Sequence, residues 1–415
     1  MRVASRNPSH RLDTVAAGMP RSLLIMALLI MLPDISVYAG TGLSAQIAGN
    51  ISNGSVVLHD ETGNELFAHN AEKLYVPASI IKILTAHIAL DVLGKEYRFK
   101  TEFYTNAAGD LAIKGFGDPY LISEEIKLIA DSLRARQIRQ IGQVFLDHSY
   151  FETNLTIPGV SRSNNPYDAL NGSLVVNFNT INIRKDAQGK VYSAEKETPL
   201  TPLAIGKARR IANGRKQRIN LSADPEDCHQ YCGELFLEIF RQAGISHSNT
   251  LIGKAKADTN WKLVYTHRNS RKLPEVLRGL LKYSNNFIAN QIFLTVGAHR
   301  KGPAATHAKA KAVFEDYIQH NMHIAGNQLT LVEGSGISRS NKTTARVMMY
   351  ILEQFRDHAD LLTPKNGHPV KSGTLSGVNN YAGYIKTGKG LRPFVIMLNQ
   401  PAARRDRIMR LLGKL

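Results

Sequence analysis

The central segment of this chain is Pro77-Ala78-Ser79-Ile80-Ile81-Lys82-Ile83-Leu84-Thr85-Ala86. Ser79 and Lys82 stand three positions apart, and a helix places such side chains on one face, about 5–6 Å apart at Cβ. A lysine desolvated among isoleucines can take the proton of a serine and turn it into a nucleophile. Pro77 and Ala78 suit a helix start, where the helix dipole favours a developing oxyanion. The segment therefore predicts an activated Ser79.

The helix that carries Ser79 is expected to extend over 78–93, with Gly94 as its C-cap. Apolar residues surround it on nearly all sides, which is typical of a central, buried helix. His87 is interpreted as a core histidine. The same Ser-x-x-Lys spacing recurs at Ser193-Ala194-Glu195-Lys196, but that stretch is polar and has no apolar helix to desolvate the lysine. The surroundings of the motif, more than its spacing, favour Ser79.

Length and composition indicate a folded protein with a basic surface. A chain of 415 residues is long enough for two or more domains, and its 21% charged and 43% hydrophobic residues argue against wholesale disorder. The formal charge of +18 would suit nucleic acid, an anionic membrane face or an acidic cell-wall polymer. The basic residues are dispersed and no nucleic-acid-binding signature is found, so we expect no nucleic acid partner. A solvated basic surface and a peripheral association with an anionic envelope are the two interpretations left.

Residues 1–39 are predicted to form a signal peptide for export to the periplasm. Leu23 to Leu32 is an apolar run too short to span a bilayer at about 1.5 Å per residue. The run follows Arg21 and precedes Val37-Tyr38-Ala39, whose small residues fit cleavage after Ala39. A retained membrane anchor is the alternative.

The two cysteines, Cys228 and Cys232, are too few for a disulfide framework. His229 lies between them, but no second group of ligand residues follows. A buried or loosely paired thiol couple is therefore favoured over a metal site, and neither a metal nor another cofactor is expected.

The pattern of apolar residues predicts an α+β fold with an inserted unit. Residues 55–59 and 65–68 flank a Gly-containing turn and are expected to form a hairpin. We interpret 97–261 as an inserted β-rich unit, with strands that include 174–179 and 218–221. The main domain would combine 40–96 with 262–415. Its last part has strand signals at 369–375, 381–385 and 393–398 and a short helix at 406–412. Helices clustered around an antiparallel sheet indicate the α+β class.

Three short motifs follow one another along the chain: Ser79-x-x-Lys82, Ser284-x-Asn286 and Lys371-Ser372-Gly373-Thr374. The order is that of serine enzymes whose signatures are S-x-x-K, a Ser-x-Asn triplet and K-T/S-G. Each motif has a second match elsewhere in the chain. Ser163-Asn164-Asn165 precedes Pro166 in a long loop, and Lys386-Thr387-Gly388 lies between two strand signals and is interpreted as a hairpin turn. Lys371 lies in a strand, which can align its backbone with an extended peptide, so the third motif is assigned to Lys371.

With these motifs the chain resembles the low-molecular-mass class C penicillin-binding proteins, which are D-alanyl-D-alanine carboxypeptidases and endopeptidases. The resemblance covers nearly the whole mature chain. The further segments that carry it are Gly115-Phe116-Gly117-Asp118-Pro119-Tyr120-Leu121, Leu146-Asp147-His148-Ser149-Tyr150-Phe151, Glu333-Gly334-Ser335-Gly336-Ile337-Ser338-Arg339, Thr374-Leu375-Ser376-Gly377-Val378 and Ala382-Gly383-Tyr384. It implies a penicillin-binding/serine β-lactamase-like transpeptidase domain, peptidoglycan stem peptides as substrates and β-lactams as covalent inhibitors.

The resemblance also implies roles for residues. Ser79 would be acylated by the penultimate D-Ala carbonyl, Lys82 would be the general base, and Ser284 would relay a proton to the leaving amine. Asn286 would hold a peptide amide, and Lys371 and Ser372 would face the terminal carboxylate. The backbone N–H groups of Ser79 and Thr374 would form the oxyanion hole, and Gly373 and Thr374 would belong to the substrate-binding residues. Asp147 would either meet the amine of a diaminopimelyl side chain or stabilise the fold.

The chain departs from the usual family pattern at three positions: Asn290 stands where glutamate is usual, Glu333 where aspartate is usual, and Ser372 where threonine is usual. These polar replacements keep hydrogen-bonding capacity, so they bear on rate or specificity more than on reaction type. Two alternatives stay open: a serine β-lactamase, which shares the motifs, and a catalytically silent peptidoglycan-binding protein. The long insert between the first two motifs favours a peptidase over a β-lactamase.

Overall fold

A computed structural model describes residues 42–247, 252–254 and 260–415. The signal peptide predicted at 1–39 lies outside the described residues. Within the described ranges, every helix is too short or too polar to span a bilayer. Leu43 to Leu415 form one compact unit, so the boundaries predicted at 97 and 261 stay predictions.

The central element is a six-stranded antiparallel sheet built from both ends of the chain. In order across the sheet, its strands are β15 (Thr363–Lys365), β16 (His368–Leu375), β17 (Val378–Thr387), β18 (Gly390–Leu398), β1 (Gly54–His59) and β2 (Glu65–His69). The predicted β1–β2 hairpin is confirmed, and Asp60 Oδ1 organises its turn by accepting hydrogen bonds from the backbone N–H groups of Thr62 and Asn64. The three predicted C-terminal strands are confirmed as β16, β17 and β18. Lys386 and Thr387 end β17 and Gly388 follows, so this motif lies at a hairpin as predicted.

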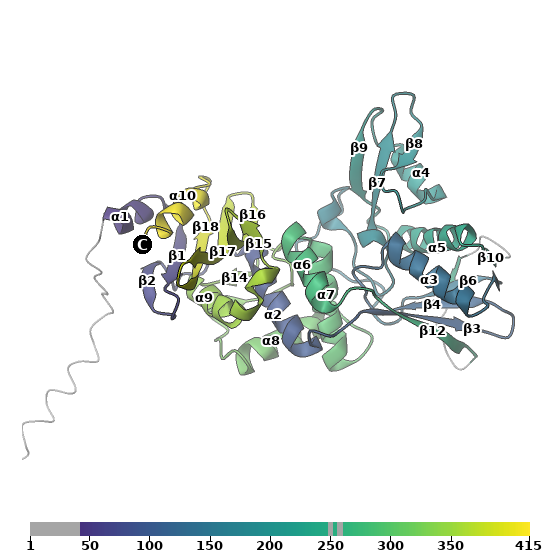
Figure 1. The fold of residues 1–415 in the computed structure, drawn as a ribbon, viewed down its shortest axis with the longest axis horizontal. Helices are drawn as coiled ribbons and strands as arrows, with labels where there is room; N and C mark the ends of the chain where they lie inside the picture. Colours follow the sequence, from purple (N-terminus) through teal and green to yellow (C-terminus); the bar gives the residue numbers. More distant parts are fainter. Residues whose placement is uncertain (1–41, 248–251, 255–259) are drawn as a thin grey trace, which may run out of the picture. The chain divides into compact units, whose positions relative to one another are not determined.

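Helices cover both faces of this sheet because its strands are apolar on both sides. Val57 and Val395 pack with the main helical core, whereas Val56 and Ile396 pack with the C-terminal helix α10 (Arg405–Leu412). Figure 1 shows α10 and α9 beside the β16–β18 strands. The other helices of this part are α1 (Gly42–Ala48), α2 (Lys82–Leu93), α6 (Leu273–Tyr283), α7 (Asn286–Lys301), α8 (His307–His320), α9 (Ala345–Gln354) and the 3₁₀ helix η4 (Arg356–Leu361).

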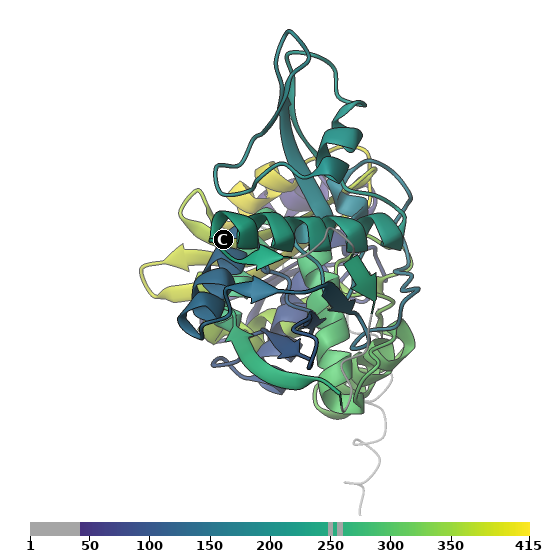
Figure 2. The same ribbon diagram turned by 90° about the vertical axis from the view of Figure 1, so that its right-hand side faces the viewer.

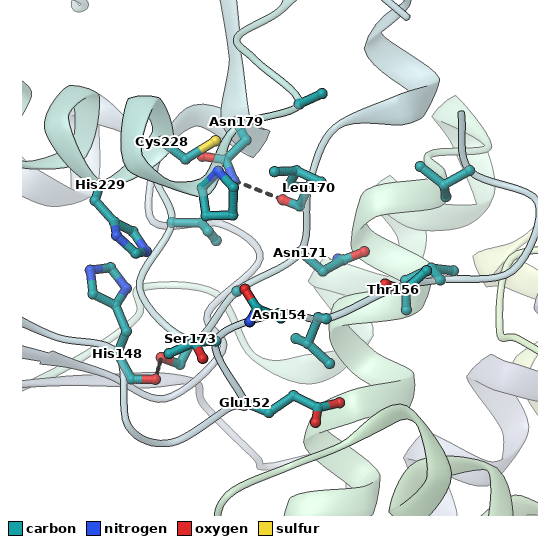
Figure 3. Close-up of a pocket in the computed structure, with 18 of the residues that line it drawn as sticks. His148, Glu152, Asn154, Thr156, Leu170, Asn171, Ser173, Asn179, Cys228 and His229 are labelled. Carbon is teal, nitrogen blue, oxygen red and sulfur yellow. Dashed lines mark hydrogen bonds between the residues drawn. The ribbon is translucent and has the colours of Figure 1, made fainter. Parts of the chain in front are cut away.

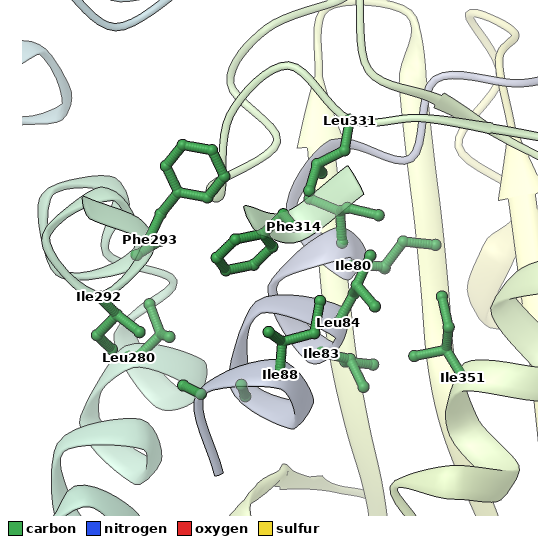
Figure 4. Packing of buried hydrophobic residues seen from close by; sticks show 14 of the residues in the cluster. Ile80, Ile83, Leu84, Ile88, Leu280, Ile292, Phe293, Phe314, Leu331 and Ile351 are labelled. Atoms are coloured by element: carbon green, nitrogen blue, oxygen red, sulfur yellow. The ribbon is translucent and has the colours of Figure 1, made fainter. Parts of the chain in front are cut away.

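The predicted central helix is confirmed, with a tighter first turn than expected. Ala78–Ile81 form the 3₁₀ helix η1, and α2 continues to Leu93, where Gly94 caps it with a φ of +82°. Ile80, Ile83, Leu84 and Ile88 are fully buried, and Figure 4 shows them packed among side chains of the surrounding helices. α2 contacts α6, α7 and α9, so Ser79 begins a helix that is enclosed by the main core.

The segment between α2 and α6 forms further sheets with their own helices. The strands of the five-stranded sheet are, in order, β11 (Ile252–Lys254), β6 (Val144–Asp147), β4 (Leu111–Gly115), β3 (Lys100–Thr105) and β12 (Lys262–Arg268). The helices α3 (Ser123–Ala135) and α5 (Pro225–Gln242) pack on each other, and Figure 2 shows α5 in front of the strands as a long teal helix. Cys228 and Cys232 lie on α5, free and buried. β12 pairs with β3, so the sheet of the inserted segment includes residues that we assigned to the main domain.

The rest of this segment is a three-stranded sheet with small elements around it. These are β7 (Thr180–Lys185), β8 (Val191–Ser193), β9 (Lys216–Asn220), α4 (Pro202–Ala208), η2 (Pro166–Asp168) and η3 (Asn177–Asn179), with the two-stranded pair β5 (Gln140–Ile141)–β10 (Ser246–His247). A second two-stranded pair, β13 (Leu329–Thr330)–β14 (Lys342–Thr343), lies outside this segment, between α8 and α9.

The strand predicted at 174–179 is wrong. Asn177, Phe178 and Asn179 have φ values of +50°, +61° and +49°, outside the extended region. Their conformation is held by side chains: Asn177 Oδ1 accepts a hydrogen bond from Ser123 N, and Asn179 Nδ2 donates one to Leu170 O at 2.7 Å. Asparagine tolerates left-handed backbone, so tertiary contacts prevail over the strand-like alternation.

Candidate active site

The turn that carries Ser79 is anchored to the central sheet by two asparagines. Asn380 on β17 donates from Nδ2 to the carbonyl oxygens of Val76 (2.9 Å) and Pro77 (2.8 Å). Asn399, just after β18, accepts a hydrogen bond from Val76 N at 2.9 Å. The backbone polar groups of Val76 and Pro77 are therefore satisfied although both residues are buried.

Two glycines allow the closest contacts of this turn. A Cβ added to Gly373 on β16 would lie 3.1 Å from Ser79 N and 2.7 Å from Pro77 O. Gly336 has a φ of +81°, and a Cβ there would lie 2.0 Å from Ala78 O. Any larger residue at either position would displace the turn, so the third motif and the 333–339 segment both fix the position of Ser79.

Lys82 is fully buried, and its amine lies between three oxygen atoms. Nζ is 2.9 Å from Ser79 Oγ, 2.8 Å from Asn286 Oδ1 and 2.5 Å from the carbonyl oxygen of Ser335. A neutral amine has two N–H groups and one lone pair, and the two carbonyl-type oxygens can only accept hydrogen bonds. They take both N–H groups, which leaves the lone pair for the Ser79 hydroxyl. This is the arrangement that a general base requires.

Burial lowers the pKa of Lys82 well below its ordinary value of 10.5. The positive charge of Lys371 lowers this pKa further, whereas the carboxylate of Glu333 raises it. Desolvation disfavours the ammonium form because the charge loses its hydration. The environment of Lys82 therefore favours the neutral amine that can accept a proton.

The carbonyl of Ser335 is fixed by a loop organised around Glu333. The buried carboxylate of Glu333 accepts hydrogen bonds from Ser335 N (2.7 Å), Ser335 Oγ (2.6 Å), Gly336 N (2.7 Å), Ser338 N (3.2 Å) and Asn341 Nδ2 (2.7 Å). So many donors fix the position of the buried carboxylate. The loop is thus a rigid partner for the Lys82 amine.

The same loop is tied to the two helices that carry the first two motifs. Asn290 on α7 accepts a hydrogen bond from Gly334 N at 2.9 Å, and Thr85 on α2 donates from Oγ1 to Gly334 O at 2.6 Å. Asn290 occupies the position where glutamate is usual, and its amide oxygen gives the loop the acceptor that it needs. This departure is compatible with an intact site.

Ser284 and Asn286 reach the site because the chain changes direction between α6 and α7. Ser284 ends α6 with a left-handed backbone (φ +52°, ψ +36°), and Asn285 caps α7 by accepting a hydrogen bond from Ile288 N at 3.0 Å. A serine with a left-handed backbone is strained, and such strain is common where the fold holds a side chain in one direction. Asn286 then meets Lys82, and Ser284 meets Lys371.

Lys371 is buried on β16 with its amine held in place. Nζ donates to Ser284 Oγ at 2.8 Å and to the carbonyl oxygen of Ser372 at 2.8 Å. Burial, followed by the positive charge of Arg405, lowers the pKa of Lys371 from 10.5 to about 7. The five predicted residues Ser79, Lys82, Ser284, Asn286 and Lys371 thus form two hydrogen-bonded groups, one around each lysine amine.

β16 offers an open edge next to these groups. β15 pairs only with His368 to Val370, so in the described part of the chain Lys371 to Leu375 have a strand on one side, β17. Side chains alternate along a strand: Lys371 and Gly373 are buried, whereas Ser372 and Thr374 are exposed. An extended peptide could pair with this edge.

Asp147 lies elsewhere, on β6 of the five-stranded sheet. Its side chain is 1% exposed; Oδ1 accepts a hydrogen bond from Ser149 N at 2.8 Å, and Oδ2 is 3.6 Å from Lys114 Nζ on the neighbouring strand. These contacts are those of a carboxylate that stabilises the sheet, one of the two roles that we considered for it. A role in substrate binding stays a prediction.

A cavity of about 320 Å³ lies in the inserted segment, away from the lysine amines. It is lined by the loop that follows β6 and by the start of α5, and the imidazoles of His148 and His229 stack at its edge with ring centroids 3.7 Å apart. Figure 3 shows these two rings facing each other and Asn171 on the side of the cavity nearer α7. None of the three motifs contributes a residue to this cavity.

Sequence reasoning missed three contributors to the site. The carbonyl of Ser335 could have been suspected from the 333–339 segment, which carries the resemblance but received no role. Asn380 and Arg405 lie outside every motif: Asn380 anchors the Ser79 turn, and Arg405 donates from Nη1 to Thr374 Oγ1 at 2.8 Å. Nothing in the local sequence distinguishes them from other polar residues.

The chain matches the sequence model of a known protein family. The sequence model of the family described as "D-Ala-D-Ala carboxypeptidase 3 (S13) family" matches residues 44–213 and 212–370. The matched region contains the first two motifs and ends just before Lys371.

Individual proteins are similar over most of the chain. A D-alanyl-D-alanine carboxypeptidase of Actinomadura sp. is 25% identical over 84% of this chain and 77% of its own length. The D-alanyl-D-alanine carboxypeptidase DacB of Haemophilus influenzae is 25% identical over 84% of this chain and 85% of its own length. The crystal structure of penicillin binding protein 4 (dacB) from Haemophilus influenzae superposes with a TM-score of 0.71 at 18% identity, covering 89% of this chain and 98% of that chain. The folds agree.

Proposed function

This chain belongs to the D-Ala-D-Ala carboxypeptidase 3 (S13) family of serine peptidases, and from this premise we propose that Ser79 is the nucleophile that hydrolyses D-Ala-D-Ala peptides of peptidoglycan. The observation that carries the assignment is the contact between Lys82 Nζ and Ser79 Oγ, 2.9 Å, inside a buried cluster. The relatives named D-alanyl-D-alanine carboxypeptidase support the substrate class.

In the first step Ser79 Oγ attacks the carbonyl carbon of the penultimate D-Ala while its proton passes to the neutral amine of Lys82. The negative charge that develops on the carbonyl oxygen would be stabilised by the N–H groups of Ser79 and Thr374, an effect worth about 2.7–4 kcal/mol per donor in comparable acyl transfer. Gly373 brings the two backbone segments together because it has no side chain. Asn286, held by Lys82, would bind a peptide amide of the substrate.

In the second step the C–N bond breaks and the leaving D-Ala amine needs a proton. Ser284 would supply it; the contact of 2.8 Å between Lys371 Nζ and Ser284 Oγ supports this, because Lys371 could then return a proton to that oxygen. The hydroxyls of Ser372 and Thr374 on the exposed face of β16 would contact the terminal carboxylate. Before the next step Lys82 would release its proton to solvent and Lys371 would take one up, which restores both amines. The neutral Lys82 amine would then take a proton from the water that attacks the ester carbonyl and give it to Ser79 Oγ as the ester C–O bond breaks.

The test is covalent capture of a β-lactam, because a β-lactam acylates such a serine and is released slowly. Intact-mass measurement after incubation with benzylpenicillin should show one adduct, and peptide mapping should place it on Ser79. Ser79→Ala should give no adduct, whereas Ser193→Ala, at the other Ser-x-x-Lys, should give the full adduct. An unmodified wild-type protein under saturating drug would contradict the proposal.

Two readouts separate the alternatives. Rapid turnover of benzylpenicillin without a lasting adduct would indicate a β-lactamase. Equal background release of D-Ala from muropeptides by wild type and Ser79→Ala would indicate a protein that only binds peptidoglycan.

We further propose that the mature protein acts in the periplasm; cleavage after Ala39, measured by N-terminal sequencing of the exported protein, would support this.

A further inference from the structure

We propose that Arg405, on the last helix, is the fixed cation that binds the terminal carboxylate of the substrate. The inference rests on the proposed function, because it assigns a partner to the carboxylate of a D-Ala-D-Ala peptide bound along β16. It adds a residue that belongs to none of the three motifs.

The direction of side chains along β16 first shows which groups can reach this carboxylate. Lys371 points to the buried face, where its amine is already hydrogen-bonded to Ser284 Oγ and to the carbonyl of Ser372. Ser372 and Thr374 are exposed, and residues two apart on a strand share one face. Both hydroxyls can therefore donate their O–H groups to a ligand on the exposed face, whereas the Lys371 amine is engaged on the other.

Arg405 is positioned on the side of these hydroxyls. Its Nη1 donates to Thr374 Oγ1 at 2.8 Å and lies 3.3 Å from the carbonyl oxygens of Gly373 and Asn380. Its guanidinium carbon lies 4.4 Å from the centre of the Tyr381 ring. These contacts hold the guanidinium plane in one orientation, so little freedom is lost when a ligand binds.

The guanidinium also has unused binding capacity. All three of its hydrogen bonds within the described residues come from Nη1, which leaves Nε and Nη2 available. The adjacent acidic residue, Asp406, interacts instead with Lys365 Nζ at 3.1 Å and with the hydroxyl of Tyr381 at 3.0 Å. No ion pair among the described residues includes Arg405, and the neighbouring carboxylate of Asp406 has Lys365 as its ion-pair partner, so no carboxylate of the described residues occupies the Arg405 N–H groups.

The chemistry of the three groups matches a carboxylate. A guanidinium with free N–H groups and two hydroxyls two residues apart can donate hydrogen bonds to both carboxylate oxygens. An arginine keeps its charge at every physiological pH, whereas a buried lysine does not. We assign the fixed charge for the carboxylate to Arg405 and the proton relay through Ser284 to Lys371.

The experiment compares two peptides that differ only at the terminal group: a diacetylated Lys-D-Ala-D-Ala with a free carboxylate, and the same peptide as its C-terminal carboxamide. Binding is measured by calorimetry in the Ser79→Ala background, which does not depend on turnover. Arg405→Gln should weaken binding of the free acid by about tenfold to a hundredfold, the range of a lost hydrogen-bonded charge. Binding of the carboxamide should change by less than about threefold.

Arg407→Gln is the matched control, since it removes the same charge from an exposed residue of the same helix; it should leave both affinities unchanged. Arg405→Lys should lose part of the preference for the free acid, because lysine keeps the charge without the planar fork. This variant also tests the proposal if Arg405→Gln unfolds, which circular dichroism will show.

Equal losses for both peptides in Arg405→Gln would overturn the proposal, because they would show a purely structural role. An unchanged affinity for the free acid would overturn it as well. A protein that prefers the free acid through Arg405 but neither releases D-Ala nor reacts with benzylpenicillin would contradict the proposed function and leave this assignment standing.

Discussion

The lysine cluster around Ser79 and the cavity beside His148 and His229 both contain titratable groups in close contact, yet they differ in every property that matters for catalysis. In the cluster, Lys82 and Lys371 are buried, each amine has defined oxygen partners, and burial lowers both pKa values. The cavity offers about 320 Å³ of space, and its walls come largely from a loop rich in polar residues. The comparison teaches that desolvation and fixed partners distinguish the candidate active site, whereas cavity volume does not.

The sharpest test of this comparison is Lys82→Met. Methionine fills similar space but cannot accept the proton of Ser79, so acylation by benzylpenicillin should slow by about a thousandfold, within the range for loss of a general base. The second-order acylation rate constant is the measurement. Lys386→Met, in the Lys-Thr-Gly at the β17–β18 hairpin, is the control and should change the rate by less than twofold. A loss below about tenfold for Lys82→Met would mean that another group is the base.

A smaller effect is expected for Glu333→Gln, which alters the loop that fixes Ser335. The carboxylate accepts hydrogen bonds from several buried donors, and a glutamine would set its own NH₂ group against some of them. The free energy of unfolding should fall by about 3 kcal/mol, as measured by urea denaturation. Glu315→Gln changes a carboxylate on α8 that makes an exposed ion pair with Lys311; its effect should stay within about 0.5 kcal/mol. Equal losses in the two variants would contradict the role given to the loop.

The depressed pKa of Lys371 predicts how stability depends on pH. Its pKa is about 7 in the folded protein against 10.5 ordinarily, so between these values the unfolded chain binds more protons and stability should rise with pH. Lys82 acts in the same direction. Above about pH 9 the rise should become weaker, because burial raises the pKa of Cys228 from 9.0 to about 12, so this thiol stays protonated in the folded protein while it ionises in the unfolded chain. The contribution of Lys371 to stability is therefore best measured between about pH 7 and 8.5.

Over that window one proton accounts for about 2 kcal/mol at about 1.4 kcal/mol per pH unit. Lys371→Met should remove this part of the rise, and Lys386→Met should keep it. The free energy of unfolding is measured by urea denaturation at each pH. If it depends on pH in the same way in wild type and Lys371→Met, the pKa of Lys371 is not lowered.

The smallest effect is expected in the inserted segment, for Asp147→Asn. Loss of the interaction with Lys114 should lower the free energy of unfolding by about 1–2 kcal/mol, while acylation by benzylpenicillin should stay within twofold of wild type. Peptides with diaminopimelic acid or lysine at the third position then decide between the two roles of Asp147. A selective loss for the diaminopimelyl peptide would show that Asp147 binds substrate, and the contrast between the two regions would be weaker than we infer.

Much of the fold and of the candidate site could be predicted because the signals are local. The turn residues predict the hairpin at 55–68, and the continuous apolar composition predicts the helix after Ser79. The motif assigned to Lys371 could be told from its competitor at Lys386 because a turn and a strand differ over a few residues. The left-handed run at Asn177–Asn179 could not be predicted, since the bonds that hold it come from Ser123 and Leu170, distant in the chain.

The sequence by itself determined the candidate pair Ser79 and Lys82, the order of the motifs and the class of the fold, because spacing, apolar periodicity and turn chemistry act between neighbouring residues. Only the tertiary structure decided which groups outside the three motifs complete the site. The carbonyl of Ser335 orients the Lys82 amine, Asn380 anchors the Ser79 turn, and Arg405 approaches Thr374 from the last helix. Each of these contacts joins segments far apart in the chain, and such contacts form only when the whole core packs.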